Sequence, residues 1–268
     1  MFKEYYGFSK NPFDKQSLCV KDAFQSKDHR EMMTRLDYLN NVRGIGVFTA
    51  APGLGKSFTL ECHAAALDRN LNEFAYICLS TVNITEFYRL FCAALGIDVK
   101  FGKQAMFRAI QDRIFHLFKE RKKPFTLFLD EAHELSDIIL KDLKMLMNFN
   151  YDSLHCFTLV LAGEPHFNRT LEKAIHESLR QRIVIHYGFS GLSDAETEQY
   201  LLHKLRIAGA AESILGEGTL SAIISYAKGC PRLLDNLMNE ALKLGSQLLK
   251  PSLNTDTIMA AANNLALA

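Results

Sequence analysis

The sequence predicts an α/β fold, in which a parallel five-stranded sheet carries helices on both faces and a smaller helical domain follows it. Two observations support this prediction. Five short apolar runs alternate with longer segments in which apolar residues recur at helical spacing. After about Gly188 such runs stop, and helical segments separated by Gly or Pro take their place. Strand–helix alternation is typical of parallel strands joined by covering helices.

The five strands are expected to be buried on both faces, because their runs are short and rich in Val, Ile, Phe or Leu. They are expected at residues 44–49, 74–79, 125–129, 157–162 and 183–187. Helices are expected at 28–41, 57–69, 85–95, 104–119, 137–148 and 166–176 in the first part of the chain. The helical domain is expected to hold helices at 193–208, 217–228, 232–248 and 254–265.

Three regions follow from this pattern: an arm at residues 1–30, an α/β core at 31–190 and a helical lid at 191–268. The arm is rich in aromatic residues and turn formers, so we expect it to wrap onto the next domain as an irregular segment. Within it, Phe8 and Phe13 can stack near a bound base or pack in a core, and core packing is favoured.

The composition is that of a folded protein, with 48% hydrophobic and 23% charged residues. Because the net charge is only +1, nucleic-acid binding would have to come from a local basic patch. No apolar stretch reaches the about 18–20 residues that span a bilayer, and the N-terminus has no signal-peptide pattern. We therefore expect a cytoplasmic protein without a membrane partner. Its six cysteines form no CxxC pair, which favours buried thiols over a metal site.

A phosphate-binding loop is predicted between the first strand and the next helix. The segment Ala50-Ala51-Pro52-Gly53-Leu54-Gly55-Lys56-Ser57 has the glycines that turn backbone N–H groups toward phosphates at a helix N-terminus. Lys56 would reach the outer phosphates of ATP, and the Ser57 hydroxyl would ligate Mg²⁺. The candidate nucleotide-binding residues here are Ala51, Pro52, Gly53, Leu54, Gly55, Lys56, Ser57 and Phe58.

The first position of this loop departs from the usual pattern, which has glycine where this chain has Ala50. Alanine is tolerated there if the backbone has a negative φ. A positive φ would cost about 1–2 kcal/mol.

Two adjacent carboxylates, Asp130 and Glu131, end the third apolar run. Neighbouring residues at a strand end point to opposite sides, so the two can take different roles. Asp130 would hold Mg²⁺ and Glu131 would polarise the attacking water, with the alternative that the pair merely caps a helix. His133 follows closely and is interpreted as incidental.

Arginines in two later segments are further candidates. Arg180 and Arg182 precede the last strand, where one of them can reach the γ-phosphate bound by a neighbouring subunit. Arg232 opens a helix of the lid and would extend toward the nucleotide. Alternatively, Arg180 and Arg182 are a solvated pair on the surface, and Arg232 is a solvated residue at the start of a helix.

With these motifs in this order, the chain resembles AAA+ ATPases over residues 40 to 240, and more narrowly the ExeA-like group, which includes transposition helpers of the TnsC, MuB and IstB type. The narrower resemblance rests on Tyr5-Tyr6-Gly7-Phe8-x-x-Asn11-Pro12-Phe13 and on Gly229-Cys230-Pro231-Arg232. The passage from Arg182 to Phe189-Ser190-Gly191-Leu192-Ser193 is similar to the arginine-finger-to-lid passage of the transposition group, which implies that Arg182 is the arginine finger and Arg232 the second sensor. The first sensor would fall at Glu164, where an acidic residue is unexpected and a water-orienting or hinge role is the alternative.

The resemblance implies an ATP-dependent transposition regulator. Such a protein assembles as a homo-oligomer with ATP between subunits, binds duplex DNA and directs a DDE transposase to its target. DNA-facing candidates are Arg89, Lys100, Lys103 and Arg108. One alternative is a secretion ATPase of the ExeA type, a class that usually carries a transmembrane segment and a wall-binding region absent from this chain. The other is a nucleotide switch with little turnover.

Overall fold

The computed structural model describes residues 2–14, 19–149, 154–210 and 212–266. The chain divides into two compact units. The core unit comprises Glu31–Pro52 and Lys56–Phe189, and the helical unit comprises Met1–Arg30, Gly53–Gly55 and Ser190–Ala268.

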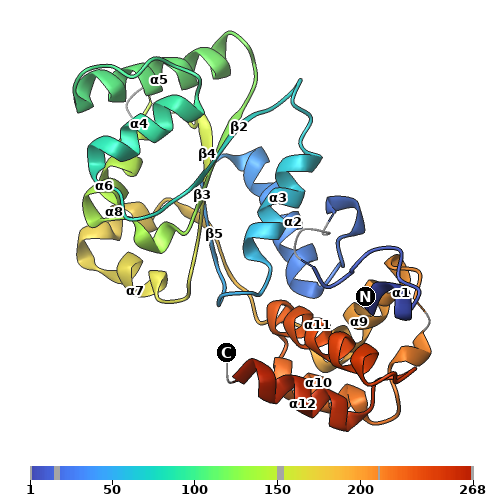
Figure 1. Ribbon diagram of the computed structural model, residues 1–268. Helices are drawn as coiled ribbons and strands as arrows, with labels where there is room; N and C mark the ends of the chain where they lie inside the picture. Colours follow the sequence, from blue (N-terminus) through green and yellow to red (C-terminus); the bar gives the residue numbers. More distant parts are fainter. Residues whose placement is uncertain (1, 15–18, 150–153, 211, 267–268) are drawn as a thin grey trace. The chain divides into compact units, whose positions relative to one another are not determined.

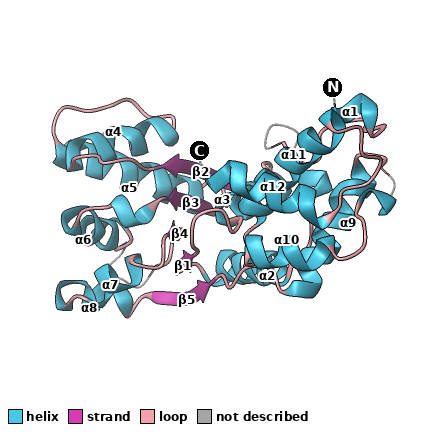
Figure 2. Ribbon diagram, turned by 60° about the horizontal axis from the view of Figure 1, so that its bottom comes forward, coloured by secondary structure: helices cyan, strands magenta, loops and turns pink. Residues whose placement is uncertain are grey.

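The core unit is built on one five-stranded sheet in the order β2-β3-β4-β1-β5, and every pairing is parallel. Figure 2 shows the strands in this order, one below the other. The predicted α/β fold with a parallel five-stranded sheet is therefore confirmed. The strands are β1 (Ile45–Thr49), β2 (Glu73–Cys78), β3 (Phe125–Asp130), β4 (Phe157–Gly163) and β5 (Ile183–Gly188).

The two faces of the sheet pack against different helices, because successive strand residues point to opposite sides. Each face of the sheet has its own hydrophobic cluster. Phe128 and Val160 belong to the cluster on one face, whereas Leu127 and Leu159 belong to the cluster on the other. Figure 1 shows α4 to α8 on one side of the sheet and α2 and α3 on the other. The helices are α2 (Lys27–Val42), α3 (Lys56–Ala66), α4 (Ile84–Ala94), α5 (Lys103–Lys119), α6 (Asp137–Leu146), α7 (Phe167–Glu172) and α8 (Glu177–Arg180).

One predicted helix of the core is interrupted. The segment 166–176 forms α7 and a short 3-10 helix, Ala174–His176, because Lys173 has an extended backbone with ψ 141°. At the start of α6, Asp137 accepts a hydrogen bond from Lys173 (3.1 Å) and lies 2.8 Å from Nε2 of His176. These contacts hold the interrupted segment against α6.

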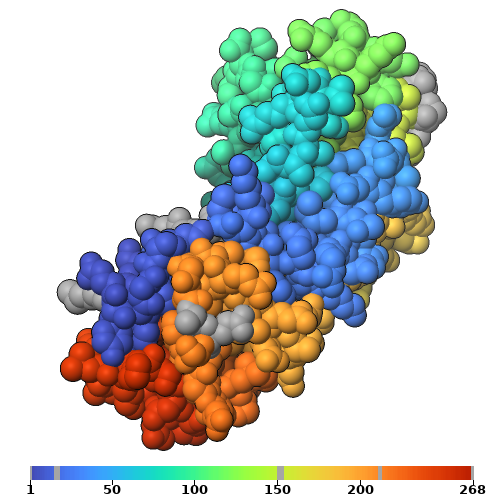
Figure 3. Space-filling view, turned by 90° about the vertical axis from the view of Figure 1, so that its right-hand side faces the viewer, coloured from blue at the N-terminus to red at the C-terminus, as the bar shows by residue number. Residues whose placement is uncertain are grey.

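The helical unit packs α9 (Asp194–Ile207), α10 (Thr219–Ala227), α11 (Pro231–Gln247) and α12 (Thr255–Ala266) around its own apolar core. Phe8 and Phe13 are buried in this core. Figure 3 shows N-terminal residues in dark blue against the orange and red helices of this unit. The short α1 (Phe2–Tyr5) and a 3-10 turn (Val20–Asp22) complete the N-terminal segment.

Polar contacts fix this N-terminal segment to α9 and α11. The amide of Asn11 donates to Asn239 Oδ1 (2.8 Å), and Asn239 donates to the Phe13 carbonyl (2.8 Å). The buried Lys204 ammonium donates to the Pro12 carbonyl at 2.7 Å. The motif Asn-Pro-Phe is thereby part of the packing of the helical unit. Among the residues described, no helix combines the length and apolarity needed to cross a membrane.

The central strand β3 provides a test of the core. Leu127→Ala removes a fully buried side chain that lies between Ala75 and Leu159 in the sheet register. We expect the free energy of unfolding to fall by about 2–5 kcal/mol, because a cavity remains beside β3. The matched control Val184→Ala, on the half-exposed edge strand β5, should cost less than about 1 kcal/mol. Urea unfolding followed by circular dichroism measures both, and equal losses would contradict this account of the core.

Candidate nucleotide-binding site

The predicted phosphate loop connects β1, which ends at Thr49, with α3, which begins at Lys56. Gly53 and Gly55 have φ values of 87° and 96°, a left-handed conformation that glycine adopts without a steric penalty. Successive backbone N–H groups in such a turn, followed by a helix N-terminus, form a concave site for anions.

The side chains of the loop are arranged as a phosphate site requires. Ala51, Pro52 and Ser57 are exposed, so the loop backbone and the first turn of α3 are open to solvent. Leu54 and Phe58 are half-buried. Both are thus placed to pack rather than to bind phosphate.

Ala50 has a negative φ, so its methyl group causes no backbone strain. The residue is 2% exposed, and its N–H donates to the Gly163 carbonyl at 3.0 Å. The loop therefore accommodates alanine at the position where the usual pattern has glycine.

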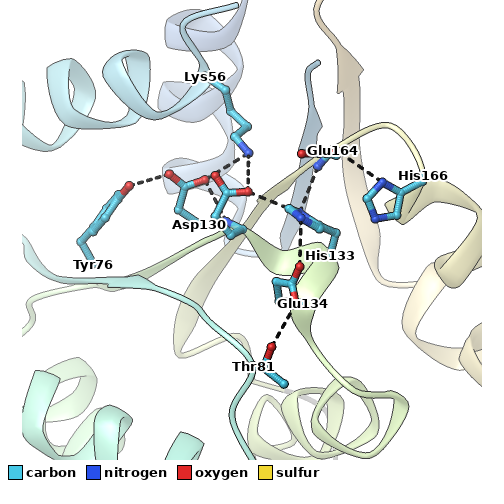
Figure 4. Close-up of polar contacts among 9 residues, drawn as sticks. Lys56, Tyr76, Thr81, Asp130, His133, Glu134, Glu164 and His166 are labelled. Carbon is cyan, nitrogen blue, oxygen red and sulfur yellow. Dashed lines mark hydrogen bonds and ion pairs between the residues drawn. The ribbon is translucent and has the colours of Figure 1, made fainter. Parts of the chain in front are cut away.

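Lys56 faces the carboxylates at the end of β3. Its Nζ lies 3.2 Å from Oδ1 of Asp130 and 3.7 Å from Oε2 of Glu131. Figure 4 shows Lys56 and Asp130 pointing toward each other. Lys56 is 7% exposed and Asp130 2%, so each charge depends on the other for compensation. The structure thus brings together the predicted phosphate-binding lysine and both predicted carboxylates.

Asp130 is held in its ionised form. Burial alone would raise its pKa, but hydrogen bonds from Ser57 and Tyr76 and the charge of Lys56 bring the pKa below its usual value. The Tyr76 hydroxyl donates to Oδ2 at 2.7 Å (Figure 4). In turn, burial and this hydrogen bond to Asp130 raise the pKa of Tyr76. A buried, ionised carboxylate beside a serine hydroxyl is a suitable pair of ligands for Mg²⁺.

Tyr76 reaches Asp130 because of the strand register. Cys78 on β2 lies opposite Asp130 on β3, and Tyr76 precedes Cys78 by two residues on the same face of the sheet. Sequence analysis missed Tyr76, since only the pairing of β2 with β3 shows that they meet.

Glu131 has an unusual backbone for a residue with a side chain, with φ 56° and ψ 37°. This left-handed conformation costs about 1–2 kcal/mol and is stabilised by the N–H of Glu131, which donates to Oδ1 of Asp130 at 2.9 Å. The sharp turn directs the partly exposed Glu131 carboxylate to the same edge of the sheet as Lys56, where it can polarise a water molecule.

His133 lies in the short 3-10 helix Ala132–Glu134 that follows this turn. Its Nδ1 lies 3.4 Å from Oε2 of Glu131 and accepts the Glu164 N–H at 3.3 Å. Gly163 permits this approach, because a Cβ there would lie 3.2 Å from the backbone nitrogen of His133. Sequence analysis interpreted His133 as incidental, and only the turn at Glu131 shows that it contacts Glu131. Glu164 follows β4 and lies against His133 and His166.

Arg182 lies at the amino ends of the strands, opposite the carboxyl ends where Lys56 and Asp130 meet. It immediately precedes β5, whose Ile183 pairs with Ile45 at the start of β1, whereas the phosphate loop follows the end of β1. The whole length of β1, which rises about 3.3 Å per residue, therefore separates Arg182 from the phosphate loop. The structure therefore does not bring Arg182 to Lys56 within one chain. The neighbouring Arg180 donates to the carbonyls of Leu171 (2.7 Å) and Lys173 (3.0 Å).

Arg232 contacts the loop residue Gly53 within the helical unit. Its N–H donates to the Gly53 carbonyl at 3.3 Å, near the start of α11, and its side chain is exposed. A Cβ at Gly53 would lie only 2.8 Å from Cβ of Arg232. The structure thus brings Arg232 to one of the predicted phosphate-loop residues.

Comparison with known proteins agrees with this geometry. A family model described as an AAA domain matches residues 40–171. General secretion pathway protein A of Aeromonas hydrophila is 27% identical over 245 residues, which cover 90% of this chain and 44% of that protein. The chain therefore spans less than half the length of this relative.

Three solved structures show the same fold at identities below 25%. Cdc6p from Pyrobaculum aerophilum has a TM-score of 0.72 and 18% identity, over 94% of this chain and 70% of that chain. The Aeropyrum pernix ORC1 protein, solved in complex with DNA, has a TM-score of 0.65 and 17% identity, over 96% and 70%. The Thermotoga maritima RuvB Holliday junction branch migration motor has a TM-score of 0.56 and 15% identity, over 90% and 70%.

The loop geometry predicts stability losses of different size for two exchanges of alanine and glycine. Ala50→Gly adds backbone freedom without relieving strain, so it should lower the free energy of unfolding by only about 1 kcal/mol. Gly53→Ala introduces a Cβ at positive φ and a close contact with Arg232, so it should cost about 2 kcal/mol or more. Urea unfolding measures both. A gain in stability for Ala50→Gly would contradict the negative φ at position 50, because glycine relieves strain only where φ is positive.

Proposed function

We propose that this chain, whose residues 40–171 match a family model described as an AAA domain, binds Mg-ATP at the loop 50–57 and hydrolyses it with the carboxylates at the end of β3. The observation that carries the proposal is the contact of the buried Lys56 ammonium with Asp130 at 3.2 Å and Glu131 at 3.7 Å. A phosphate-binding cation, a metal-binding carboxylate and a general base at one sheet edge are the parts that hydrolysis of a nucleoside triphosphate needs.

Each side chain then has a distinct role. The N–H groups of the loop and the Lys56 ammonium bind the outer phosphates, and the Ser57 hydroxyl and Asp130 hold Mg²⁺. When Mg²⁺ is bound, it would neutralise part of the negative charge of the phosphates. Glu131 accepts a proton from the attacking water, and its contact with Lys56 and with His133 fixes the carboxylate before the water is bound.

Hydrolysis in this proposal requires a second subunit. Because Arg182 lies at the sheet edge remote from the phosphate loop of its own chain, the finger would come from a neighbour, with ATP between subunits. Both guanidinium groups contact backbone carbonyls, Arg180 those of Leu171 and Lys173 and Arg182 that of Lys144 at 3.5 Å, so the preference for Arg182 rests on the motif resemblance. Arg232, beside Gly53, would link the helical unit to the phosphates as the second sensor. Glu164 would act as a positioning residue for His133 instead of contacting phosphate.

DNA is the proposed partner of the assembled form, and direction of a DDE transposase to target DNA is its proposed purpose. The support is the motif resemblance to transposition helpers and the exposed basic residues of α4, α5 and their connection. Phe101, fully exposed between Lys100 and Lys103, adds an apolar side chain that can contact bases. The exposed basic residues are Arg89, Lys100, Lys103 and Arg108, of which Lys103 also pairs with Asp142 at 2.6 Å.

A secretion role is the second candidate. It is favoured by the 27% identity with general secretion pathway protein A, which covers 90% of this chain. In that case the same ATPase site would drive an envelope complex, and the exposed connection between α4 and α5 would bind protein instead of DNA.

Three substitutions test the ATPase site. Glu131→Gln should keep ATP binding and lower turnover at least about 100-fold, because the base is lost while the side-chain volume is kept. Lys56→Ala should lose both binding and turnover. Arg182→Ala should lose turnover while ATP still binds, since the finger acts in trans. Fluorescent-nucleotide binding and phosphate release measure the two properties. Equal, near-zero rates for the unaltered protein and Glu131→Gln would instead indicate a nucleotide switch.

A charge reversal tests the DNA half of the proposal. Duplex binding by gel shift at low salt should require ATP, compared with ADP and with no nucleotide. Lys100→Glu should weaken it about tenfold or more, because a phosphate contact becomes a repulsion. Lys243→Glu, an equal charge change at an exposed position of α11, should leave affinity within about twofold. No shift under any nucleotide condition would exclude DNA as the partner.

A further inference from the structure

Three side chains outside the proposed magnesium site gather at the carboxyl edge of the sheet: His133, Glu164 and His166. Each offers one ligand atom, and these atoms all lie within 4.8 Å of one another. His133 follows β3, whereas Glu164 and His166 follow β4, and the two strands are neighbours in the sheet. Figure 4 shows the three side chains converging beside Asp130 and Lys56.

We propose that this cluster is a binding site for a divalent transition metal of the Zn²⁺ class. Two imidazole nitrogens and one carboxylate oxygen form the donor set that Zn²⁺ takes when a fourth position stays open to solvent. Mg²⁺ prefers oxygen ligands and would remain with Ser57 and Asp130. The proposed site is therefore chemically distinct from the one that serves ATP.

The spacing of the donors fits a small tetrahedral shell. Nδ1 of His166 lies 3.4 Å from Oε2 of Glu164. Two ligands with bonds of about 2.0–2.2 Å to one tetrahedral ion are about 3.4 Å apart. The ring centroids of His133 and His166 are 4.8 Å apart, and the edge of one ring faces the plane of the other. Because the His166 side chain is 54% exposed, it can rotate the small distance that would bring all three donors onto one ion.

His133 is oriented for this role from its far side. Its Nε2 lies 3.4 Å from Oε1 of Glu134, and Oε2 of Glu134 accepts a hydrogen bond from Thr81 at 3.5 Å (Figure 4). A carboxylate on one ring nitrogen is the usual partner of a metal-bound histidine, because it fixes the tautomer and the direction of the ring. The nitrogen on the other side, Nδ1, is then the metal-binding atom, and an ion there would replace the Glu164 N–H that donates to it at 3.3 Å.

Metal binding at this site would inhibit ATP hydrolysis. The same Nδ1 lies 3.4 Å from Oε2 of Glu131, so an ion there would attract the Glu131 carboxylate away from Lys56 and from the water that it activates. This consequence rests on the proposed role of Glu131 as the general base. The binding of metal does not rest on it.

Direct metal binding tests the site without nucleotide or turnover. Protein freed of metal with a chelator is titrated with Zn²⁺ by equilibrium dialysis, and Co²⁺ absorption reports the coordination geometry. We expect one equivalent bound by the unaltered protein, at least tenfold weaker binding by His166→Asn, and about 10–100-fold weaker binding by Glu134→Gln. His155→Asn removes an exposed histidine outside the cluster and should change affinity less than twofold. No bound Zn²⁺, or an unchanged affinity in His166→Asn, would overturn the site.

Phosphate release at fixed Mg-ATP and buffered free Zn²⁺ tests the inhibition. Turnover should fall as Zn²⁺ occupies the site in the unaltered protein and stay constant in His166→Asn. If Zn²⁺ binds with one equivalent while turnover is unaffected, the inhibitory coupling is wrong. If the protein has no turnover at all, the ATPase proposal fails, while dialysis still decides whether the metal site exists.

Discussion

The buried contact between Lys56 and Asp130 is the constraint on which the rest of the site depends. Two opposite charges that are nearly excluded from water, 3.2 Å apart, are tolerated only because each compensates the other. The hydrogen bonds from Tyr76 and Ser57 complete the solvation of the carboxylate. The strand order of the parallel sheet brings together a lysine that follows β1 and an aspartate that ends β3.

Parallel strands also explain why the candidate reactive groups collect at one edge of the sheet. The proposed phosphate loop, the two carboxylates and the histidine cluster all lie at the carboxyl ends of strands, which is where parallel α/β sheets bind ligands. Arg182 precedes β5 and so belongs to the opposite edge. A charge supplied from there can act only across a subunit boundary, which is why the proposed ATPase requires assembly.

The five strands could be predicted from the sequence, because buried parallel strands are short apolar runs. The loop at the end of β1 and the carboxylates at the end of β3 could be found from their motifs, because a glycine-rich loop between a strand and a helix has few other uses. The sequence could not predict the contact of His133 with Glu131, since this depends on the left-handed turn at Glu131, which no propensity indicates for glutamate. The interruption at Lys173 was missed for a similar reason. It depends on the contacts that Lys173 and His176 make with Asp137.

Ala50 shows what limits variation in the phosphate loop. With a negative φ and 2% exposure, this position is restricted by the volume of its side chain and not by its backbone. Alanine is therefore accommodated here without strain, whereas a branched or longer side chain would have to displace its buried surroundings. A search pattern that demands glycine at this position would overlook chains of this kind, although their loop has the full geometry.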